Sequence, residues 1–330
     1  MIEDYDLVTR ESFDDATLRE INKINNNITN ICYSNSSFIP NYELEDLSDE
    51  IVDKVFEFWK QCDIKGFVLP VYMFNDSYVN RIGTFIEKTI QEGFNLDTLK
   101  FHCRKPEIED LATSSVSQEK YKDKLLEIVD FVKGKIPLKR VTILNERNDI
   151  ILDNDNTSWI LGMIEELHNR DIEVSITFDS IESLNRTLMN RPSIIKKLDF
   201  LCSNYYPFVS VNLGKTSQEE YKQAFDSVIN FSDYIKINCQ NKKFIISECG
   251  VIPYEEALTA TWKYSSKDKN QFPNGATYNS NIPLNYIKGF FENTGSNKID
   301  EVWGWFINPY IYRSTADYSN YASYLSNIRR

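Results

Sequence analysis

Short apolar runs alternate with longer amphipathic segments along most of this chain. A run of about five to seven apolar residues is typical of a strand that is buried on both faces. Apolar positions at helical spacing between such runs are typical of helices that pack one side against a sheet. The predicted strands are 28–33, 66–72, 99–103, 140–145, 173–178, 199–205, 244–248 and 301–306. The predicted helices are 47–62, 77–93, 117–134, 156–170, 180–190, 217–238, 282–295 and 318–330.

This alternation predicts an α/β fold of the (β/α)8 TIM-barrel type, in which each strand is followed by a helix. We expect a single domain over residues 1–330, because no linker rich in Pro, Gly or Ser divides the chain. Residues 1–24 are expected to form a helical extension before the barrel. The alternative is an open doubly wound sheet, but no GxGxxG or GxxxxGK(S/T) motif follows a predicted strand.

Composition and charge narrow the classes of partner. The chain is 42% hydrophobic and 26% charged, as globular proteins are, with a net charge of −12. Nucleic-acid binding requires clustered Lys and Arg, so we expect no nucleic-acid partner. No run approaches the roughly 20 apolar residues of a membrane span, so we expect no membrane partner. We also expect a monomer.

Cysteine and histidine usage predicts no cofactor. The six cysteines include no CxxC pair, and two histidines are too few for a histidine-based metal cage. Buried, reduced thiols fit a cytoplasmic location. The acidic amino terminus shows no apolar signal-peptide core, which also favours the cytoplasm, with a secreted mature form as the alternative.

Two of the predicted strands end in a glutamate. The fourth strand runs into Glu146 in VTILNE, and the seventh runs into Glu248 in FIISE. The carboxyl ends of all barrel strands meet at one face, where barrel enzymes keep their catalytic groups. Two carboxyl groups are what hydrolysis of a glycosidic bond requires.

Polar and aromatic residues at other strand ends are expected at the same face. The segment 249–280 after the seventh strand is long and rich in aromatic residues, and we expect it to form a wall of a substrate groove. The candidate substrate-binding residues are His102, Arg104, Asn145, Asn204, Tyr205, Tyr206, Trp262 and Trp305.

These motifs resemble those of the clan A retaining glycoside hydrolases, a superfamily of (β/α)8 barrels. LNERN at 144–148 is similar to its Asn-Glu acid/base motif, and ISECG at 246–250 to its nucleophile motif. SNYYPF at 203–208 and WGWF at 303–306 are similar to its sixth and eighth strands. The context is most similar to the β-mannanase, β-galactanase and β-1,3-glucanase groups. Arg147 departs from the pattern, since a small residue or Pro often follows Asn-Glu, and this puts the loop shape in doubt.

The resemblance implies a retaining β-glycoside hydrolase that cleaves a β-linked oligo- or polysaccharide. Glu146 would be the acid/base and Glu248 the nucleophile, with Asn145 bonded to the sugar 2-hydroxyl.

The surroundings of the two glutamates are expected to separate these roles. Burial and the neighbouring carboxylate should raise the pKa of Glu146. A hydroxyl of Tyr205 or Tyr206, together with Arg104, should keep Glu248 ionised.

Two hypotheses from other classes remain open. One is a carbohydrate-binding protein whose barrel is like that of a hydrolase but has lost catalysis. The presence of both glutamates and of Asn145 argues against this hypothesis. The other is a barrel lyase or aldolase. That chemistry requires a Schiff-base lysine at a strand tip or a metal cluster, and the sequence pattern predicts neither.

Overall fold

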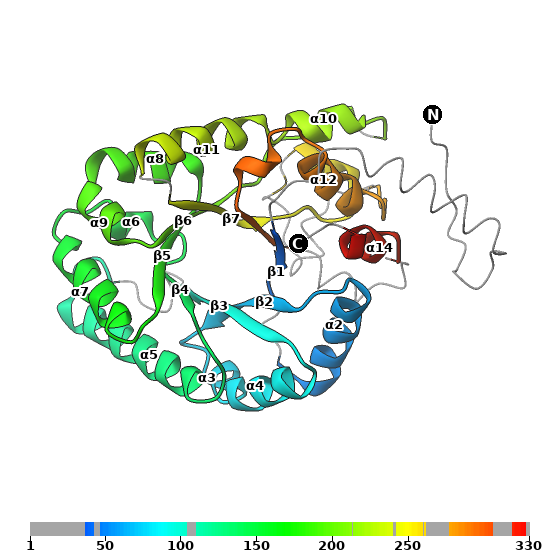
Figure 1. The fold of residues 1–330 in the computed structure, drawn as a ribbon. Helices are drawn as coiled ribbons and strands as arrows, with labels where there is room; N and C mark the ends of the chain where they lie inside the picture. The colour runs from blue at the N-terminus through cyan, green and yellow to red at the C-terminus, as the bar shows by residue number, and fades with distance from the viewer. Residues whose placement is uncertain are drawn as a thin grey trace.

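The computed structural model describes residues 37–42, 47–103, 110–212, 214–239, 242–259, 261, 277–305 and 319–327. Within these ranges, eight parallel strands surround the centre of the molecule and helices lie outside them (Figure 1). The strands are β1 (Ser37–Pro40), β2 (Gly66–Tyr72), β3 (Asn95–His102), β4 (Arg140–Ile143), β5 (Glu173–Phe178), β6 (Phe200–Asn204), β7 (Lys243–Cys249) and β8 (Glu301–Gly304).

The strands close into a barrel. Their order is β1-β8-β7-β6-β5-β4-β3-β2, with parallel pairing throughout. The two ends of this order meet where Asn41 bridges Val68 and the Tyr42 amide donates to the Val68 carbonyl at 2.8 Å. The predicted (β/α)8 barrel is therefore confirmed.

Most of the described helices bury one face, as their periodicity predicts. In α5, the buried residues Tyr121, Leu125, Ile128 and Val132 recur every three or four positions. The α-helices are α2 (Asp49–Gln61), α3 (Asp76–Val79), α4 (Ile82–Gln91), α5 (Ser115–Lys133), α6 (Asn148–Ile151), α7 (Thr157–His168), α8 (Ile181–Asn190), α9 (Pro192–Lys197), α10 (Gln218–Gln223), α11 (Asp226–Asn238), α12 (Ile282–Phe291) and α14 (Ser319–Asn327). Short 3-10 helices are η2 (Glu255–Thr259) and η4 (Ser296–Lys298).

The first strand differs from its predicted position. The predicted strand 28–33 lies outside the described residues, and the place beside β8 is filled by β1. The sequence of β1 is SFIP, which is only four residues long and ends in a proline, so its strand signal is weak. The expectations of a helix at 1–24 and of a single domain over the whole chain stay predictions.

Two predicted helices are interrupted. The segment 77–93 contains the end of α3 and all of α4, and 217–238 contains α10 and α11. A buried aromatic residue lies beside each break: Tyr78 donates its hydroxyl to the Pro70 carbonyl, and Phe225 packs against neighbouring rings. Packing of these rings against the core is more favourable than continuing the helix through each break.

The barrel interior carries charge at its amino-terminal end. Arg140, at the start of β4, is ion-paired with Asp97 and with Glu301, the latter at 2.8 Å. Its guanidinium lies over the rings of Phe200 and Trp303, inside the barrel. This cluster closes the bottom of the barrel, while the carboxyl end carries a separate polar network.

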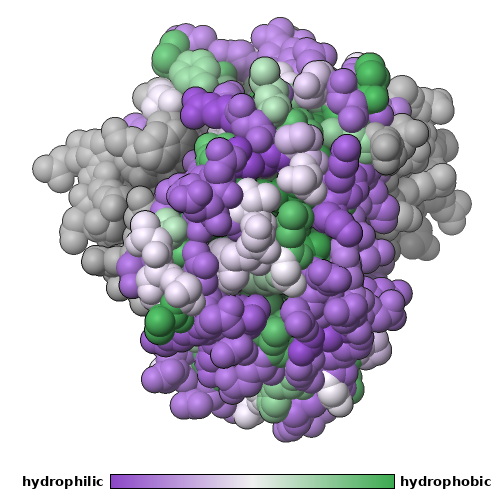
Figure 2. All heavy atoms as spheres, turned by 90° about the vertical axis from the view of Figure 1, so that its left-hand side faces the viewer, coloured by the Kyte–Doolittle hydropathy of each residue, from purple (hydrophilic) through white to green (hydrophobic). Residues whose placement is uncertain are grey.

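The outer face on the side of α7 and α9 is mostly hydrophilic (Figure 2). Hydrophobic residues lie there in small groups among hydrophilic ones, as expected for helices that bury only their inner faces. In the part of the chain that the structure describes, no helix combines the length and the apolar character needed to cross a bilayer.

Candidate active site

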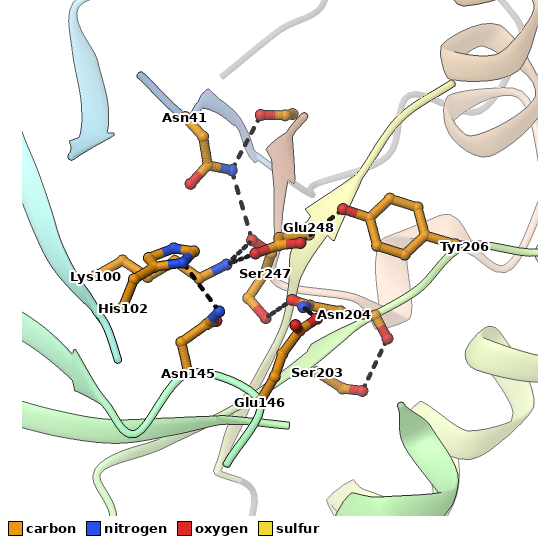
Figure 3. A network of polar contacts seen from close by, with 11 residues as sticks. Asn41, Lys100, His102, Asn145, Glu146, Ser203, Asn204, Tyr206, Ser247 and Glu248 are labelled. Carbon is orange, nitrogen blue, oxygen red and sulfur yellow. Dashed lines mark hydrogen bonds and ion pairs between the residues drawn. The ribbon is translucent and has the colours of Figure 1, made fainter. Parts of the chain in front are cut away.

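Glu146 and Glu248 both lie at the carboxyl end of the barrel. Glu146 follows β4 by three residues, and Glu248 is the penultimate residue of β7. Glu248 is buried. Glu146 has exposed surface as a residue, but its carboxyl group lies within the site, against the Asn204 amide. Figure 3 shows their side chains entering one network of polar contacts from different strands. The two carboxyl groups are therefore brought together in different surroundings.

An irregularity in β7 aims two successive side chains at this network. The β7 register shifts against β8 between Ile246 and Cys249, and against β6 at Glu248. In a regular strand, successive side chains point to opposite faces. Here the Ser247 hydroxyl donates to Asn204 while the Glu248 carboxylate contacts Lys100. A shift of register of this kind commonly re-aims a side chain next to an active site.

Both oxygens of the Glu248 carboxylate have a partner. Oε1 is ion-paired with the ammonium group of Lys100, and Oε2 accepts from the Tyr206 hydroxyl at 2.7 Å. Lys100 also donates to the Ser247 carbonyl at 3.2 Å. A cation and a hydroxyl donor both favour the charged form of a carboxyl group. The Glu248 carboxylate thus has a cation at one oxygen and a hydroxyl donor at the other.

The Tyr205 hydroxyl, also expected beside Glu248, has other partners. The Tyr205 hydroxyl donates to the Ala224 carbonyl at 2.8 Å and also contacts Ser227. Of the two tyrosines, Tyr206 thus makes the expected contact. Arg104 and Trp262 lie outside the described residues, as does much of the segment 249–280.

Glu146 has neutral contacts and a raised pKa. Its Oε1 accepts from the Asn204 amide at 2.6 Å, and the amide oxygen of Asn204 accepts from Ser247 at 3.0 Å. Burial of the carboxyl group and then the Glu248 charge raise the pKa of Glu146 to about 7, against the opposing effects of Lys100 and Asn204. Glu146 can thus hold a proton near neutral pH, as the sequence analysis expected.

The backbone around Glu146 is strained. Leu144 and Glu146 have φ angles of 53° and 58°, in the left-handed region that residues other than glycine seldom adopt. The Leu144 amide donates to the buried Tyr121 hydroxyl at 3.1 Å, and the Glu146 amide donates to the Thr177 carbonyl at 2.9 Å. Such conformations persist where the surroundings hold them, and they are frequent at active sites.

Arg147, the residue at which the sequence departs from the Asn-Glu motif, makes contacts that support the loop around Glu146. It is buried, and its guanidinium makes two 3.0 Å contacts with the Asp149 carboxylate. A third contact of 3.5 Å reaches the Cys103 sulfur. The larger residue therefore pairs within the protein and leaves the glutamate before it open to the site.

Aromatic rings and amides form a second part of the site. The His102 ring lies 5.2 Å from Tyr72 and 6.1 Å from Trp305, nearly parallel to the latter. The Asn145 amide nitrogen is 3.3 Å from His102 Nδ1. The Asn145 side-chain oxygen is buried and has no hydrogen-bond partner among the described residues.

Lys100 and Ser247 are the site residues that the sequence analysis missed. The signal for Lys100 was its spacing, since it lies two residues before His102 and so shares its face of β3. A single lysine in an apolar strand does not by itself indicate a site. Within the described ranges, no group of three or more His, Cys, Asp or Glu side chains is placed to hold a metal ion.

Comparison with known proteins gives matches in structure but not in sequence. No family model and no curated protein sequence matches the chain. A GH5_18 protein from Bifidobacterium longum subsp. infantis aligns with a TM-score of 0.54 at 9% identity, over 82% of this chain and 69% of that one.

Two further structures align at a TM-score of 0.51. The endo-β-1,4-mannanase from Thermotoga petrophila is 14% identical, over 83% of this chain and 67% of that one. A glycoside hydrolase family 5 enzyme from Prevotella bryantii B14 is 10% identical, over 83% of this chain and 84% of that one. Likeness at such low identity concerns the fold, and this chain therefore has the (β/α)8-barrel fold of these glycoside hydrolase structures.

Proposed function

We propose that this protein is a retaining β-glycoside hydrolase acting on a β-linked oligo- or polysaccharide. The observation that carries the proposal is the pair of carboxyl groups held in opposite surroundings. Glu248 is ion-paired with Lys100, whereas Glu146 has a pKa raised to about 7. A cation beside one carboxyl group and a raised pKa at the other suit the roles of nucleophile and general acid.

In the first step, Glu248 is the nucleophile and Glu146 the acid. The Glu248 carboxylate forms a bond to the anomeric carbon as the bond to the leaving oxygen breaks, and Glu146 gives that oxygen its proton. The hydrogen bond from Asn204 to one Glu146 oxygen leaves the other oxygen to carry the proton. The product of this step is a covalent glycosyl-enzyme.

In the second step, Glu146 acts as the base. Esterification removes the charge of Glu248, which was one of the causes of the raised pKa of Glu146. Glu146 is then ionised and takes a proton from water as the water oxygen attacks the anomeric carbon. The Glu248 carboxylate leaves with its electron pair, and the sugar keeps its original anomeric configuration.

The second part of the site supports a neutral sugar as substrate. Trp305 presents an aromatic face beside His102, and the Asn145 amide contacts the same histidine. A structural neighbour is an endo-β-1,4-mannanase, so mannan is the first polysaccharide to test.

Lys100 also bears on the lyase hypothesis, because a lysine does point into the barrel. A Schiff base requires a neutral amine that can reach a carbonyl carbon. The Lys100 side chain is completely buried and its amine is ion-paired with Glu248. This geometry favours the hydrolase.

The test is hydrolysis of aryl β-glycosides, mannan, galactan and β-1,3-glucan by the wild type, Glu146→Gln and Glu248→Gln. We expect the wild type to release sugar, and each variant to lose activity by a factor on the order of 1,000 or more. Product NMR should show the β-anomer first. A wild type that binds a glycan but cleaves none would favour the binding-protein alternative.

A further inference from the structure

Lys100 is a lysine whose side chain has no exposure to solvent. It belongs to β3, and its exposed fraction is 0%. Lysine is almost never completely buried unless its charge is paired, because loss of water around an ammonium group is strongly unfavourable. Its partners should therefore explain why the barrel contains it.

The partners of Lys100 all lie at the catalytic end of the barrel. Its ammonium group is ion-paired with Glu248 and donates to the Ser247 carbonyl at 3.2 Å (Figure 3). It also lies 5.5 Å from the centre of the Trp305 ring. Strands β3 and β7 are not neighbours in the sheet. The ion pair therefore spans the barrel interior.

Lys100 touches one of the two carboxyl groups and not the other. Glu248 has the cation, whereas the Glu146 carboxyl group accepts from the neutral Asn204 amide. Two nearby carboxyl groups compete for a single proton, and an adjacent cation decides which of them gives it up. Other titratable groups around Glu248 are His102 on β3, Tyr206 after β6, Glu146 after β4 and Cys249 on β7.

We propose that Lys100 is a positioning residue that assigns the nucleophile role to Glu248 and the acid/base role to Glu146. The proposal rests on the proposed hydrolase function. With the proton on Glu146, the charges of Lys100 and Glu248 cancel. The site then receives a neutral sugar with its nucleophile already ionised and held at both oxygens.

The same ion pair affects the second step. When Glu248 becomes an ester, Lys100 loses this anionic partner and, among the described residues, keeps the Ser247 carbonyl and the Trp305 ring. Breaking the ester bond restores the carboxylate, with its electron pair, beside Lys100. Water supplies the new bond at the anomeric carbon, and its proton goes to Glu146. Lys100 therefore favours departure of the sugar from the enzyme.

The test is the pH profile of kcat/KM for Lys100→Met, on whichever aryl β-glycoside the wild type cleaves. Loss of the cation should move the acid limb upward by about 1–3 pH units, because Glu248 then needs a higher pH to ionise. At a fixed pH on that limb, kcat/KM should fall about tenfold for every pH unit that the limb moves. Lys100→Arg keeps the charge and should move the limb less.

Arg140→Met is the matched control, because it breaks a buried ion pair at the opposite end of the same barrel. It should lower the melting temperature without moving the acid limb. A Lys100→Met profile that coincides with the wild type, while Glu248→Gln is inactive, would overturn the proposal and leave the hydrolase function standing. A wild type without glycosidase activity would instead overturn the function itself.

Thermal unfolding tests the ion pair without any substrate. Lys100→Met should lower the melting temperature less in the Glu248→Gln background, where no unpaired carboxylate is left behind. Lys100→Gln is the second charge-free variant, for use if Lys100→Met does not fold. Equal losses in the two backgrounds would contradict the pairing on which the proposal depends.

Discussion

Tyr205 and Tyr206 are adjacent residues whose hydroxyls have different partners. The Tyr206 hydroxyl donates to the Glu248 carboxylate, and the Tyr205 hydroxyl donates to a main-chain carbonyl. A hydrogen bond to a charged group contributes about 1.5–3 kcal/mol. We therefore expect Tyr206→Phe to lower kcat/KM by about 10- to 100-fold, measured on the best substrate of the panel.

Tyr205→Phe is the control for this prediction. It removes the same atom one position away, so it should lower the melting temperature slightly and leave kcat/KM within a few-fold of the wild type. The opposite ranking of the two variants would mean that Tyr206 does not hold the nucleophile in solution.

Single residues differ in how far the sequence predicts them. Glu146 and Glu248 were predictable because each ends an apolar run. Lys100 was not, because its role depends on Glu248, which is 148 positions away. The strained conformation at Leu144 was not predictable either, since leucine has no preference for positive φ.

At the scale of elements, the contact between β7 and β8 positions Trp305. Gly250 follows β7, and a Cβ atom there would overlap the Trp305 carbonyl group. Only glycine fits such an approach. Gly250→Ala should displace Trp305, destabilise the fold by about 1–3 kcal/mol, and lower kcat/KM by about 10- to 100-fold.

Gly162→Ala is the matched control for Gly250→Ala. Gly162 lies within α7, and a Cβ atom there would meet nothing within 4 Å. Alanine in a helix interior is favoured over glycine by about 0.5–1 kcal/mol. This variant should be slightly more stable than the wild type by denaturant unfolding and equally active. Equal stability and activity of Gly250→Ala and Gly162→Ala would contradict the close approach of Gly250 to Trp305.

Elements were predictable where local pattern decides them. Of the eight strands among the described residues, seven follow from apolar runs, because strands covered on both faces have no polar alternation. The first strand was missed because β1 is short and ends in proline. The register shift near Glu248 was not predictable, since it arises from pairing with β6 and β8.

At the scale of the whole molecule, the described residues place an ion-pair cluster at each end of the barrel interior. Arg140 pairs with Asp97 and Glu301 where the strands begin, and Lys100 pairs with Glu248 where they end. Between them lies an apolar cluster that includes Cys202 and Trp303. The first cluster closes the barrel, and the second provides charge at the proposed site.

The stability of the folded protein should also depend on pH, because the site holds the Glu146 carboxyl group at a raised pKa. The pKa of its carboxyl group is raised to about 7 in the folded protein, from an ordinary value of 4.5. The folded state therefore binds the proton more tightly, and stability is lost as the pH rises from 4.5 through about 7. Glutamine cannot ionise, so the melting temperature of Glu146→Gln should rise relative to the wild type between about pH 5 and pH 8.

Glu220 provides a control whose pKa moves in the opposite direction. Hydrogen bonds from Ser210 and Ser217 lower the pKa of Glu220 to about 2, so its contribution is present above its ordinary range and is lost as the pH falls through about 2. Between about pH 5 and pH 8 the difference between Glu220→Gln and the wild type should therefore stay constant. If the Glu146→Gln difference is equally constant, the Glu146 carboxyl group is ionised throughout this range, and it cannot be the proton donor near neutral pH.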